Sequence, residues 1–302
     1  MFRFYIPRGL PDYDMPLYRP PSEADSLIFQ VTLGCSHNKC AFCFMYRDKR
    51  FRIRPRENVI AEIETAAVNL PSVRRIFFAD GDSLVVKTKT LIEYAELCYK
   101  RFPKLERIGV YATPQNFLVK SVAELKSISS AGVTIAYFGV ESGDPTITRL
   151  INKGVTIEDM ERAAKRAMDT GFTLSVTVLV GLGGTEKSAQ HAENTGRFIS
   201  RVEPHYASAL TLMLGPFEEQ YRKEYGESWT PLDKYQSLEE IRLLIENIET
   251  KREVVFRANH ASNWLALKGT LPADKGNLLK LIDDTLSDPD SPHWRPEEWR
   301  AL

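Results

Sequence analysis

Residues 26–46 read SLIFQVTLGCSHNKCAFCFMY, and this stretch introduces the pattern on which the fold prediction rests. Its first eight residues, 26–33, are mostly apolar or β-branched and predict a buried strand. The strand leads directly into a loop that carries Cys35, Cys40 and Cys43 in the spacing C-x4-C-x2-C. A buried strand whose carboxyl end opens into a loop with reactive side chains is typical of α/β proteins.

The same alternation of strand and helix continues along the chain. Further apolar strands are predicted at residues 75–79, 107–112, 134–140, 173–180 and 206–214. Amphipathic helices are predicted at residues 56–70, 89–102, 122–130, 157–170, 187–202 and 238–248. Near-continuous apolar strands that alternate with amphipathic helices indicate a parallel sheet covered by helices. This alternation alone fits either an open doubly wound sheet or a partial barrel.

The positions of the polar segments favour the barrel. Each predicted strand up to the fifth is followed by polar residues, at 35–43, 80–82, 113–116, 141–143 and 181–185. In α/β barrels the active site lies at this end of the strands. We therefore predict an α/β fold with a partial (β/α)6 TIM-like barrel at residues 26–250. An N-terminal arm at residues 1–25 precedes it, and a short C-terminal extension at residues 251–302 closes its open side.

Composition and charge narrow the function classes. The 302 residues include 40 Lys and Arg against 40 Asp and Glu, whereas nucleic-acid binders usually carry a basic excess. We see no signal peptide and no window near the ~20 apolar residues of a membrane span. We therefore expect a cytoplasmic protein whose partners include neither nucleic acid nor a membrane. Three of the four cysteines fall within nine residues, which favours a metal or redox site over a disulfide scaffold.

Clustered thiolates suit an iron–sulfur cluster or zinc, because sulfur is a soft ligand. A [4Fe–4S] cluster normally takes four thiolates, so three leave one iron open to a small molecule. The fourth cysteine, Cys98, lies in the middle of a predicted helix and is interpreted as a small buried hydrophobe. Two alternatives stay open at this point, a structural zinc site with His37 as fourth ligand and reduced cysteines with a purely structural role.

Residues 35–43 resemble the cluster loop of the radical S-adenosylmethionine (SAM) superfamily, and the resemblance extends over residues 26–214. The usual spacing there is C-x3-C-x2-C, so this chain has one extra residue between its first two cysteines. Phe42 matches the aromatic residue that precedes the last cysteine. The resemblance implies that Cys35, Cys40 and Cys43 bind a [4Fe–4S] cluster and that SAM is the second cofactor.

The resemblance also implies the reaction and the SAM contacts. The enzyme would cleave SAM reductively to a 5′-deoxyadenosyl radical, which abstracts hydrogen from a small-molecule or peptide substrate. An electron donor such as flavodoxin or ferredoxin would reduce the cluster. Residues 79–82 (ADGD) stand where most members have a Gly-Gly-Glu-like segment, and residues 212–214 could pack against adenine. The implied cofactor-binding residues are Phe42, Asp80, Gly81, Asp82, Glu141, Ser142, Lys153 and Gly181.

Polar residues at the remaining strand ends are candidates for the substrate shell. Residues 256–264 (FRANHASNW) concentrate Arg, Asn and His after a short predicted strand at 254–257. This segment is either a substrate-facing loop or a loop whose Asn and Ser side chains satisfy their own backbone. The candidate catalytic residues are Asp82, Tyr111, Arg257 and His260. The other shell candidates are Thr113, Gln115, Asn116, Asn259, Ser262 and Asn263.

Cysteine counting excludes a second cysteine-ligated cluster, because only Cys98 remains after the first. The chain also looks like a set of stand-alone radical SAM proteins that have no assigned reaction. It shares with them CSHNKCxFC, ADGD and the late stretch NHASNWLxLKGTLPADK. The alternative function is a zinc- or iron–sulfur-containing binding or redox protein that does not cleave SAM.

Overall fold

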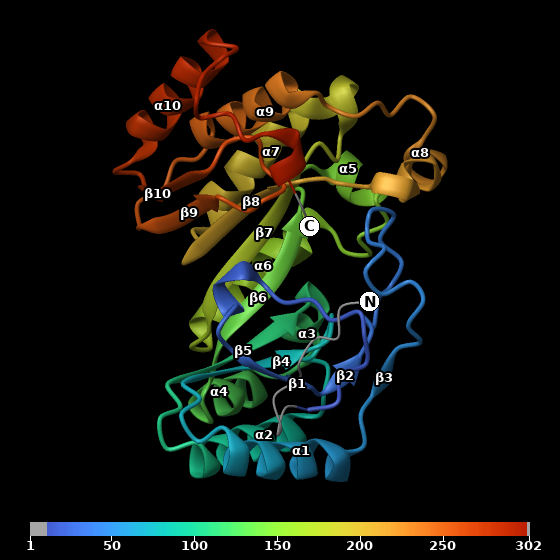
Figure 1. Ribbon diagram of the computed structural model, residues 1–302, viewed down its shortest axis with the longest axis vertical. Coiled ribbons are helices and arrows are strands. Elements are labelled where there is room, and N and C mark those ends of the chain that lie inside the picture. Colours follow the sequence, from blue (N-terminus) through green and yellow to red (C-terminus); the bar gives the residue numbers. More distant parts are fainter. Residues whose placement is uncertain (1–10, 301–302) are drawn as a thin grey trace. The chain divides into compact units, whose positions relative to one another are not determined.

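The computed structural model describes residues 11–300 and divides into two compact units (Figure 1). The first unit comprises Met1–Asn38, Met45–Tyr137 and Arg166–Thr173, and the second comprises Lys39–Phe44, Phe138–Lys165 and Leu174–Leu302. Strand β6 (Val133–Glu141) begins in the first unit and ends in the second. Within residues 11–300, no helix combines the length and the apolar character needed to cross a membrane.

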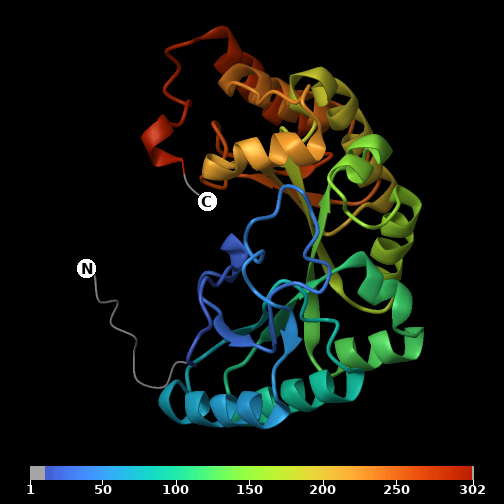
Figure 2. The same cartoon turned by 90° about the vertical axis from the view of Figure 1, so that its right-hand side faces the viewer.

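The first unit is built on parallel strands in the order β1-β4-β5-β6. Strand β1 (Leu27–Gln30) pairs with β4 (Arg75–Ala79), and β4 pairs with β5 (Arg107–Ala112). Every residue of β1 is buried, as expected for a parallel strand covered on both faces. Helices α1 and α2 lie side by side along this sheet (Figures 1 and 2). The helices of this unit are α1 (Arg56–Asn69), α2 (Thr88–Arg101), α3 (Pro114–Val119) and α4 (Val122–Ser130).

The predicted strand at residues 26–33 is divided into two. Strand β1 ends at Gln30, and β2 (Thr32–Leu33) pairs antiparallel with β3 (Arg52–Ile53) instead of continuing the main sheet. Both residues of β3 are exposed, so this strand has no apolar pattern in the sequence. Because β2 and β3 flank the cysteine segment, their pairing ties together the two ends of a long loop.

The second unit contains the strand order β6-β7-β8-β9-β10. Its strands β7, β8 and β9 are parallel, and β10 runs antiparallel to β9. The strands are β7 (Thr173–Val180), β8 (Tyr206–Thr211), β9 (Val254–Ala258) and β10 (Leu267–Leu271). The remaining helices are α5 (Pro145–Leu150), α6 (Ile157–Asp169), α7 (Gly184–Val202), α8 (Glu218–Tyr225), α9 (Lys234–Glu246) and α10 (Lys275–Ser287).

The predicted C-terminal extension is part of the second unit's sheet. The strand predicted at 254–257 is confirmed as β9, whereas β10 was not predicted. Helix α10 packs on α9, and the Lys275 ammonium donates to the backbone carbonyls of Glu246 and Ile248 at 2.8 Å each. The predicted arm is irregular over residues 11–20 and ends in the short 3-10 helix η1 (Pro21–Glu23). Residues 1–10 of the arm lie outside the described residues, and the domain boundaries stay predictions.

Candidate functional site

Cys40 and Cys43 lie in one tight turn of the second unit. The Cys43 amide donates to the Cys40 carbonyl at 3.1 Å, and the Ala41 amide between them donates to the Ile151 carbonyl at 2.9 Å. Ala41 is buried in an apolar cluster that also contains residues of the turn after β7 and of the segment after β8. The cluster comprises Ala41, Ile147, Ile151, Leu182, Leu214, Tyr221, Tyr225 and Trp229, with Phe42, Phe44, Leu150, Leu179 and Leu212 packed against it.

Cys35 lies in the first unit, directly after β2. Cys35, Cys40 and Cys43 are half-buried, and Cys98 is fully buried in α2 as predicted. Within residues 11–300, no cysteine forms a disulfide, and no three His, Cys, Asp or Glu side chains make a group that could hold a metal ion. The structure therefore brings the second and third cysteines together, and the ligand role of all three stays a prediction.

Asp80 follows β4 and is fully buried. Its Oδ2 accepts hydrogen bonds at 3.2 Å from the Gly34 amide, the Gln30 side-chain amide and the Lys49 ammonium. Burial raises the pKa of Asp80, although these three donors favour the charged form. Its Oδ1 is also buried and has no hydrogen-bond partner among residues 11–300. Asp80 thus combines a well-bound oxygen with an unused acceptor.

Asp82 is fully buried two residues further on. Its Oδ2 accepts a hydrogen bond from the Ser36 hydroxyl. Burial raises the pKa of Asp82 to about 6, against the opposing influence of Ser36, the Asn116 side chain, the Val85 backbone and the Lys120 charge. Burial therefore favours the neutral form of this carboxyl group more than it would for an exposed aspartate.

Glu141 and Lys153 form an ion pair in the second unit. The Lys153 ammonium lies 3.1 Å from Glu141 Oε1, and both side chains are largely buried. Glu141 ends β6 with a φ of 65°, an uncommon backbone conformation for a residue with a side chain. Ser142 is buried, and its hydroxyl accepts from the Asp144 amide at 3.0 Å. The segment after β6 thus presents a paired carboxylate and ammonium on a tightly bonded turn.

The glycine-rich turn at residues 181–184 is held by side chains that the sequence analysis did not identify. The Gly181 amide donates to Glu240 Oε1 at 2.7 Å, and Glu240 is buried beside His191 at 3.0 Å. Aromatic side chains hold the carbonyls of the turn. Trp229 donates to Gly181 at 3.3 Å, Tyr221 to Leu182 at 2.9 Å and Tyr225 to Gly183 at 3.4 Å. The sequence signal that could have identified these aromatic partners is the spacing of Tyr221, Tyr225 and Trp229 in residues 221–229, which read YRKEYGESW.

A cavity of about 60 Å³ lies at the carboxyl ends of β7 and β8. Gly181, Leu212 and Leu214 line it, so three of the residues assigned to SAM by resemblance surround one cavity. The other lining residues are Val180, Thr211, Glu218, Trp229, Pro231, Leu232 and Ser237.

The loop after β9 is held mainly by hydrogen bonds to β8. Asn263 is buried, accepts from the Thr211 hydroxyl and donates to the Ala209 carbonyl, both at 2.8 Å. The Ser262 hydroxyl accepts from the Thr211 amide, and the Ser262 amide donates to His260 Nδ1, both at 3.1 Å. Burial lowers the pKa of His260. Three of these four hydrogen bonds tie the loop to β8 and one lies within the loop, so both interpretations of this segment stay predictions.

The remaining shell candidates divide between exposed and structural positions. The Arg257 guanidinium donates to the carbonyls of Phe256 and Gly269, and Asn116 caps α3 by accepting from the Thr113 amide at 2.8 Å. The ring of Tyr111 is half-buried and lies edge-on to Phe77, with 4.8 Å between ring centroids. Gln115 is half-buried, and Asn259 is exposed.

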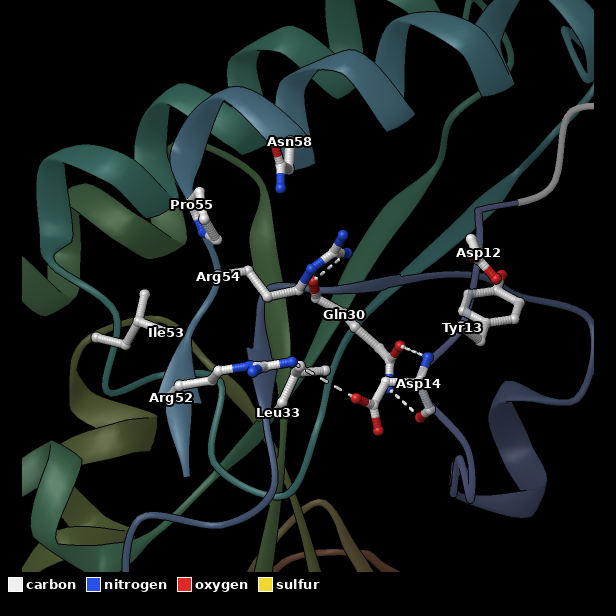
Figure 3. Close-up of a pocket in the computed structure, with 10 residues that line it drawn as sticks. All are labelled: Asp12, Tyr13, Asp14, Gln30, Leu33, Arg52, Ile53, Arg54, Pro55 and Asn58. Carbon is white, nitrogen blue, oxygen red and sulfur yellow. Dashed lines mark hydrogen bonds and ion pairs between the residues drawn. The ribbon is translucent and has the colours of Figure 1, made fainter. Parts of the chain in front are cut away.

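A larger cavity of about 580 Å³ lies in the first unit (Figure 3). Arg54 points into it and is paired with Glu62 at 2.5 Å, while Asp14 pairs with Lys49 at 3.1 Å. Gln30 lines this cavity and also donates to Asp80. The lining residues are Asp12, Tyr13, Asp14, Gln30, Leu33, Arg52, Ile53, Arg54, Pro55 and Asn58, none of which is a predicted site residue.

Comparison with known proteins supports the sequence interpretation. The model of the Radical SAM superfamily matches residues 29–195. A protein of Pyrococcus horikoshii named as the uncharacterized methyltransferase PH0819 is 28% identical over 203 residues, which are 66% of this chain and 42% of that protein. The chain therefore spans less than half the length of this relative.

Two solved structures have a similar fold. Coproporphyrinogen III oxidase (HemN) from Escherichia coli has a TM-score of 0.52 at 15% identity, over 71% of this chain and 50% of that one. The methyltransferase TsrM from Kitasatospora setae, with cobalamin and a [4Fe–4S] cluster bound, has a TM-score of 0.50 at 18% identity. The match covers 65% of this chain and 38% of TsrM. These similarities confirm the predicted α/β fold, which in solved radical SAM enzymes is a partial TIM barrel. This chain belongs to the Radical SAM superfamily, whose enzymes use a [4Fe–4S] cluster and SAM.

Proposed function

We propose that Cys35, Cys40 and Cys43 bind three irons of a single [4Fe–4S] cluster and that SAM binds the fourth iron. The observation that carries this proposal is the three-thiol loop within the matched superfamily region. Three thiolates are a suitable donor set, because they leave one iron open to the amino and carboxylate groups of SAM. With both groups bound, the cofactors would supply a 5′-deoxyadenosyl radical that takes hydrogen from the substrate.

The second unit supports a SAM site through its apolar cluster. The Cys40–Cys43 turn, Leu182 of the glycine-rich turn and Leu214 belong to the same cluster, and Phe42 packs against it. Such packing fixes the backbone of the cysteine turn and of the glycine-rich turn, so that a ligand would meet a preformed surface. We infer that the cavity beside Gly181 receives part of the adenosine of SAM. Phe42 and Ser142 would contribute the nearby walls.

The Glu141–Lys153 ion pair is our candidate for binding the amino-acid end of SAM. An ammonium group has three donors, so Lys153 can serve Glu141 and a ligand carboxylate at once. The Glu141 carboxylate offers acceptors for a ligand amine. In the first unit, Asp80 has an unused acceptor in its Oδ1, and Asp80, Gly81 and Asp82 stay predicted SAM contacts through the resemblance alone.

The substrate is proposed to be a small molecule or a peptide, and the electron donor a flavodoxin or ferredoxin. Tyr111, Arg257 and His260 remain the candidates for substrate contact. Of these, Arg257 already binds two backbone carbonyls, so Tyr111 and His260 are the first choices for substitution.

The test is anaerobic reconstitution with iron and sulfide, followed by dithionite reduction in the presence of SAM and an assay for 5′-deoxyadenosine. We expect the wild-type protein to release 5′-deoxyadenosine and Cys40→Ala to release none. A protein that takes up zinc, or that forms a cluster and leaves SAM intact, would instead favour the alternative binding or redox function.

A further inference from the structure

The segment Asp80-Gly81-Asp82 contacts both sequence neighbours of Cys35. Asp80 Oδ2 accepts from the amide of Gly34, which precedes the cysteine, and Asp82 Oδ2 accepts from the hydroxyl of Ser36, which follows it. Both carboxylates are fully buried. A hydrogen bond donated to a charged carboxylate is stronger than one between neutral groups, and here two such bonds flank a single residue, Cys35.

The Asp80 side of this arrangement is itself fixed by a polar network. The Lys49 ammonium lies 3.2 Å from Asp80 and 3.1 Å from Asp14, and it is largely buried. Gln30 donates both to Asp80 and to the Asp14 carbonyl, at 3.2 and 2.9 Å. Asp80 therefore has little freedom to follow a moving loop, and its position determines that of Gly34.

Gly81 brings the backbone of the segment directly against the cysteine. A Cβ atom on Gly81 would lie 3.1 Å from the Cys35 Cβ and 2.5 Å from the Tyr46 ring. The second distance is shorter than real side chains allow, so a larger residue here would displace Tyr46 or the loop. Gly81 thus allows the backbone of residues 80–82 to lie close to Cys35, and the hydrogen bonds of Asp80 and Asp82 hold the two segments together.

We propose that Asp80, Gly81 and Asp82 are positioning residues that fix Cys35 for cluster binding. The inference rests on the proposed ligand role of Cys35. The loop has one residue more between its first two cysteines than the usual spacing of the superfamily, and a longer loop loses more conformational entropy when its ligands are brought together. The contacts at Gly34 and Ser36 remove much of that freedom before the cluster binds. Substitution of a residue that orients a metal ligand commonly lowers metal affinity by about 10–100-fold.

Ser36→Ala is the most informative variant, because it removes one hydroxyl and leaves the carboxylate and the cysteine in place. Ser26→Ala is its matched control. Like Ser36, Ser26 lies in the first unit and donates to a buried carboxylate, that of Glu23, but it touches no predicted cluster ligand. Ser26 is itself buried whereas Ser36 is exposed, so general destabilisation should be at least as large in the control. Asp82→Ala and Asp82→Asn extend the series, since the amide of Asn retains an acceptor for Ser36.

The measurement is the rate at which the reconstituted cluster loses iron to a ferrous chelator, together with the electron paramagnetic resonance spectrum of the reduced cluster. We expect about a 10-fold faster loss in Ser36→Ala and Asp82→Ala, and rates near wild type in Ser26→Ala and Asp82→Asn. Thermal unfolding without iron shows whether each variant is folded. If Asp82→Ala is unfolded, Ser36→Ala alone decides.

The outcomes separate this inference from the proposed function. A wild-type protein that holds no iron–sulfur cluster would contradict the proposed function and this inference with it. A wild-type protein with a cluster, and folded Ser36→Ala and Asp82→Ala variants that lose iron at the wild-type rate, would overturn only the positioning role. Equal acceleration in Ser26→Ala and Ser36→Ala would also overturn it, because the effect would then reflect general destabilisation.

Discussion

Asp82 and Asp144 are both fully buried and both follow a parallel strand, yet their pKa values are shifted in opposite directions. Asp144 accepts four hydrogen bonds. Its Oδ1 accepts from the amides of Thr146 and Ile147 at 2.9 Å, and its Oδ2 from the side chains of Gln190 and Asn194 at 2.7 and 2.6 Å. Burial alone would raise the pKa of Asp144, but these donors lower it.

The environment of Asp82 is poorer in donors. Ser36, the Asn116 side chain and the Val85 backbone favour its charged form, but its Oδ1 has no partner among the described residues. The effect of burial therefore dominates and raises its pKa to about 6. The difference between the two residues teaches that burial alone does not decide the pKa of a carboxyl group, because donors that face both of its oxygens can outweigh burial. Asp144 is the N-cap of α5. Asp82, in contrast, lies in the segment that contacts the neighbours of Cys35, and one oxygen each of Asp80 and Asp82 has no hydrogen-bond partner among the described residues.

The largest effect is expected from Asp144→Ala. The substitution removes the N-cap of α5 and leaves two backbone amides and two side-chain amides without their acceptor, so we expect a loss of roughly 3–5 kcal/mol in unfolding free energy. Chemical denaturation of the iron-free protein at pH 7 measures it. Because the folded-state pKa of Asp144 is lowered, its contribution is present above the unfolded-state pKa and decreases as the pH falls through the folded-state value. A variant as stable as the wild type would contradict the capping role.

Asp82→Asn should increase the free energy of unfolding, whereas Asp144→Ala decreases it. A raised folded-state pKa means that the charged carboxylate destabilises the fold above about pH 6 and that this penalty disappears near the ordinary value of 3.8. A shift of about two pKa units corresponds to roughly 3 kcal/mol. The groups that face Asp82 are Ser36, Asn116, the Val85 backbone and Lys120, and burial lowers the pKa of Lys120.

The measurement is the unfolding midpoint of iron-free Asp82→Asn and wild-type protein between pH 4 and 8. We expect the variant to be the more stable at pH 8, by at most that amount, and the two to converge toward pH 4. A constant difference across this range would show that Asp82 does not change its charge there.

The sequence predicted the regular elements well, because the parallel strands are continuous apolar runs. The strands predicted at residues 107–112 and 173–180 have the same bounds as β5 and β7. The short helices α3 and α5 were missed, although each begins with Pro after a residue suited to an N-cap, Thr113 and Asp144.

The partners of the site residues could not be predicted in the same way. The sequence indicated carboxylates after the second strand of the predicted barrel, but the contacts of Asp80 and Asp82 lie 46 residues earlier, at Gly34 and Ser36. Glu240 binds Gly181 from 59 residues away, on a helix whose pattern shows only amphipathicity. Such pairs depend on which elements become neighbours, and periodicity within a segment carries no information about that.

The smallest predicted effect is that of Gly81→Ala on the first unit. The added methyl would lie 2.5 Å from the Tyr46 ring, and overpacking of this kind costs about 1–3 kcal/mol. Gly276→Ala is the matched control, because a Cβ at Gly276 in α10 meets nothing within 4 Å and Ala favours a helix by roughly 0.5–1 kcal/mol. The two glycine-to-alanine changes should therefore move the unfolding free energy in opposite directions. If Gly81→Ala were as stable as the wild type, the segment after β4 would have room to shift, and its close approach to Cys35 could not be what fixes the cysteine.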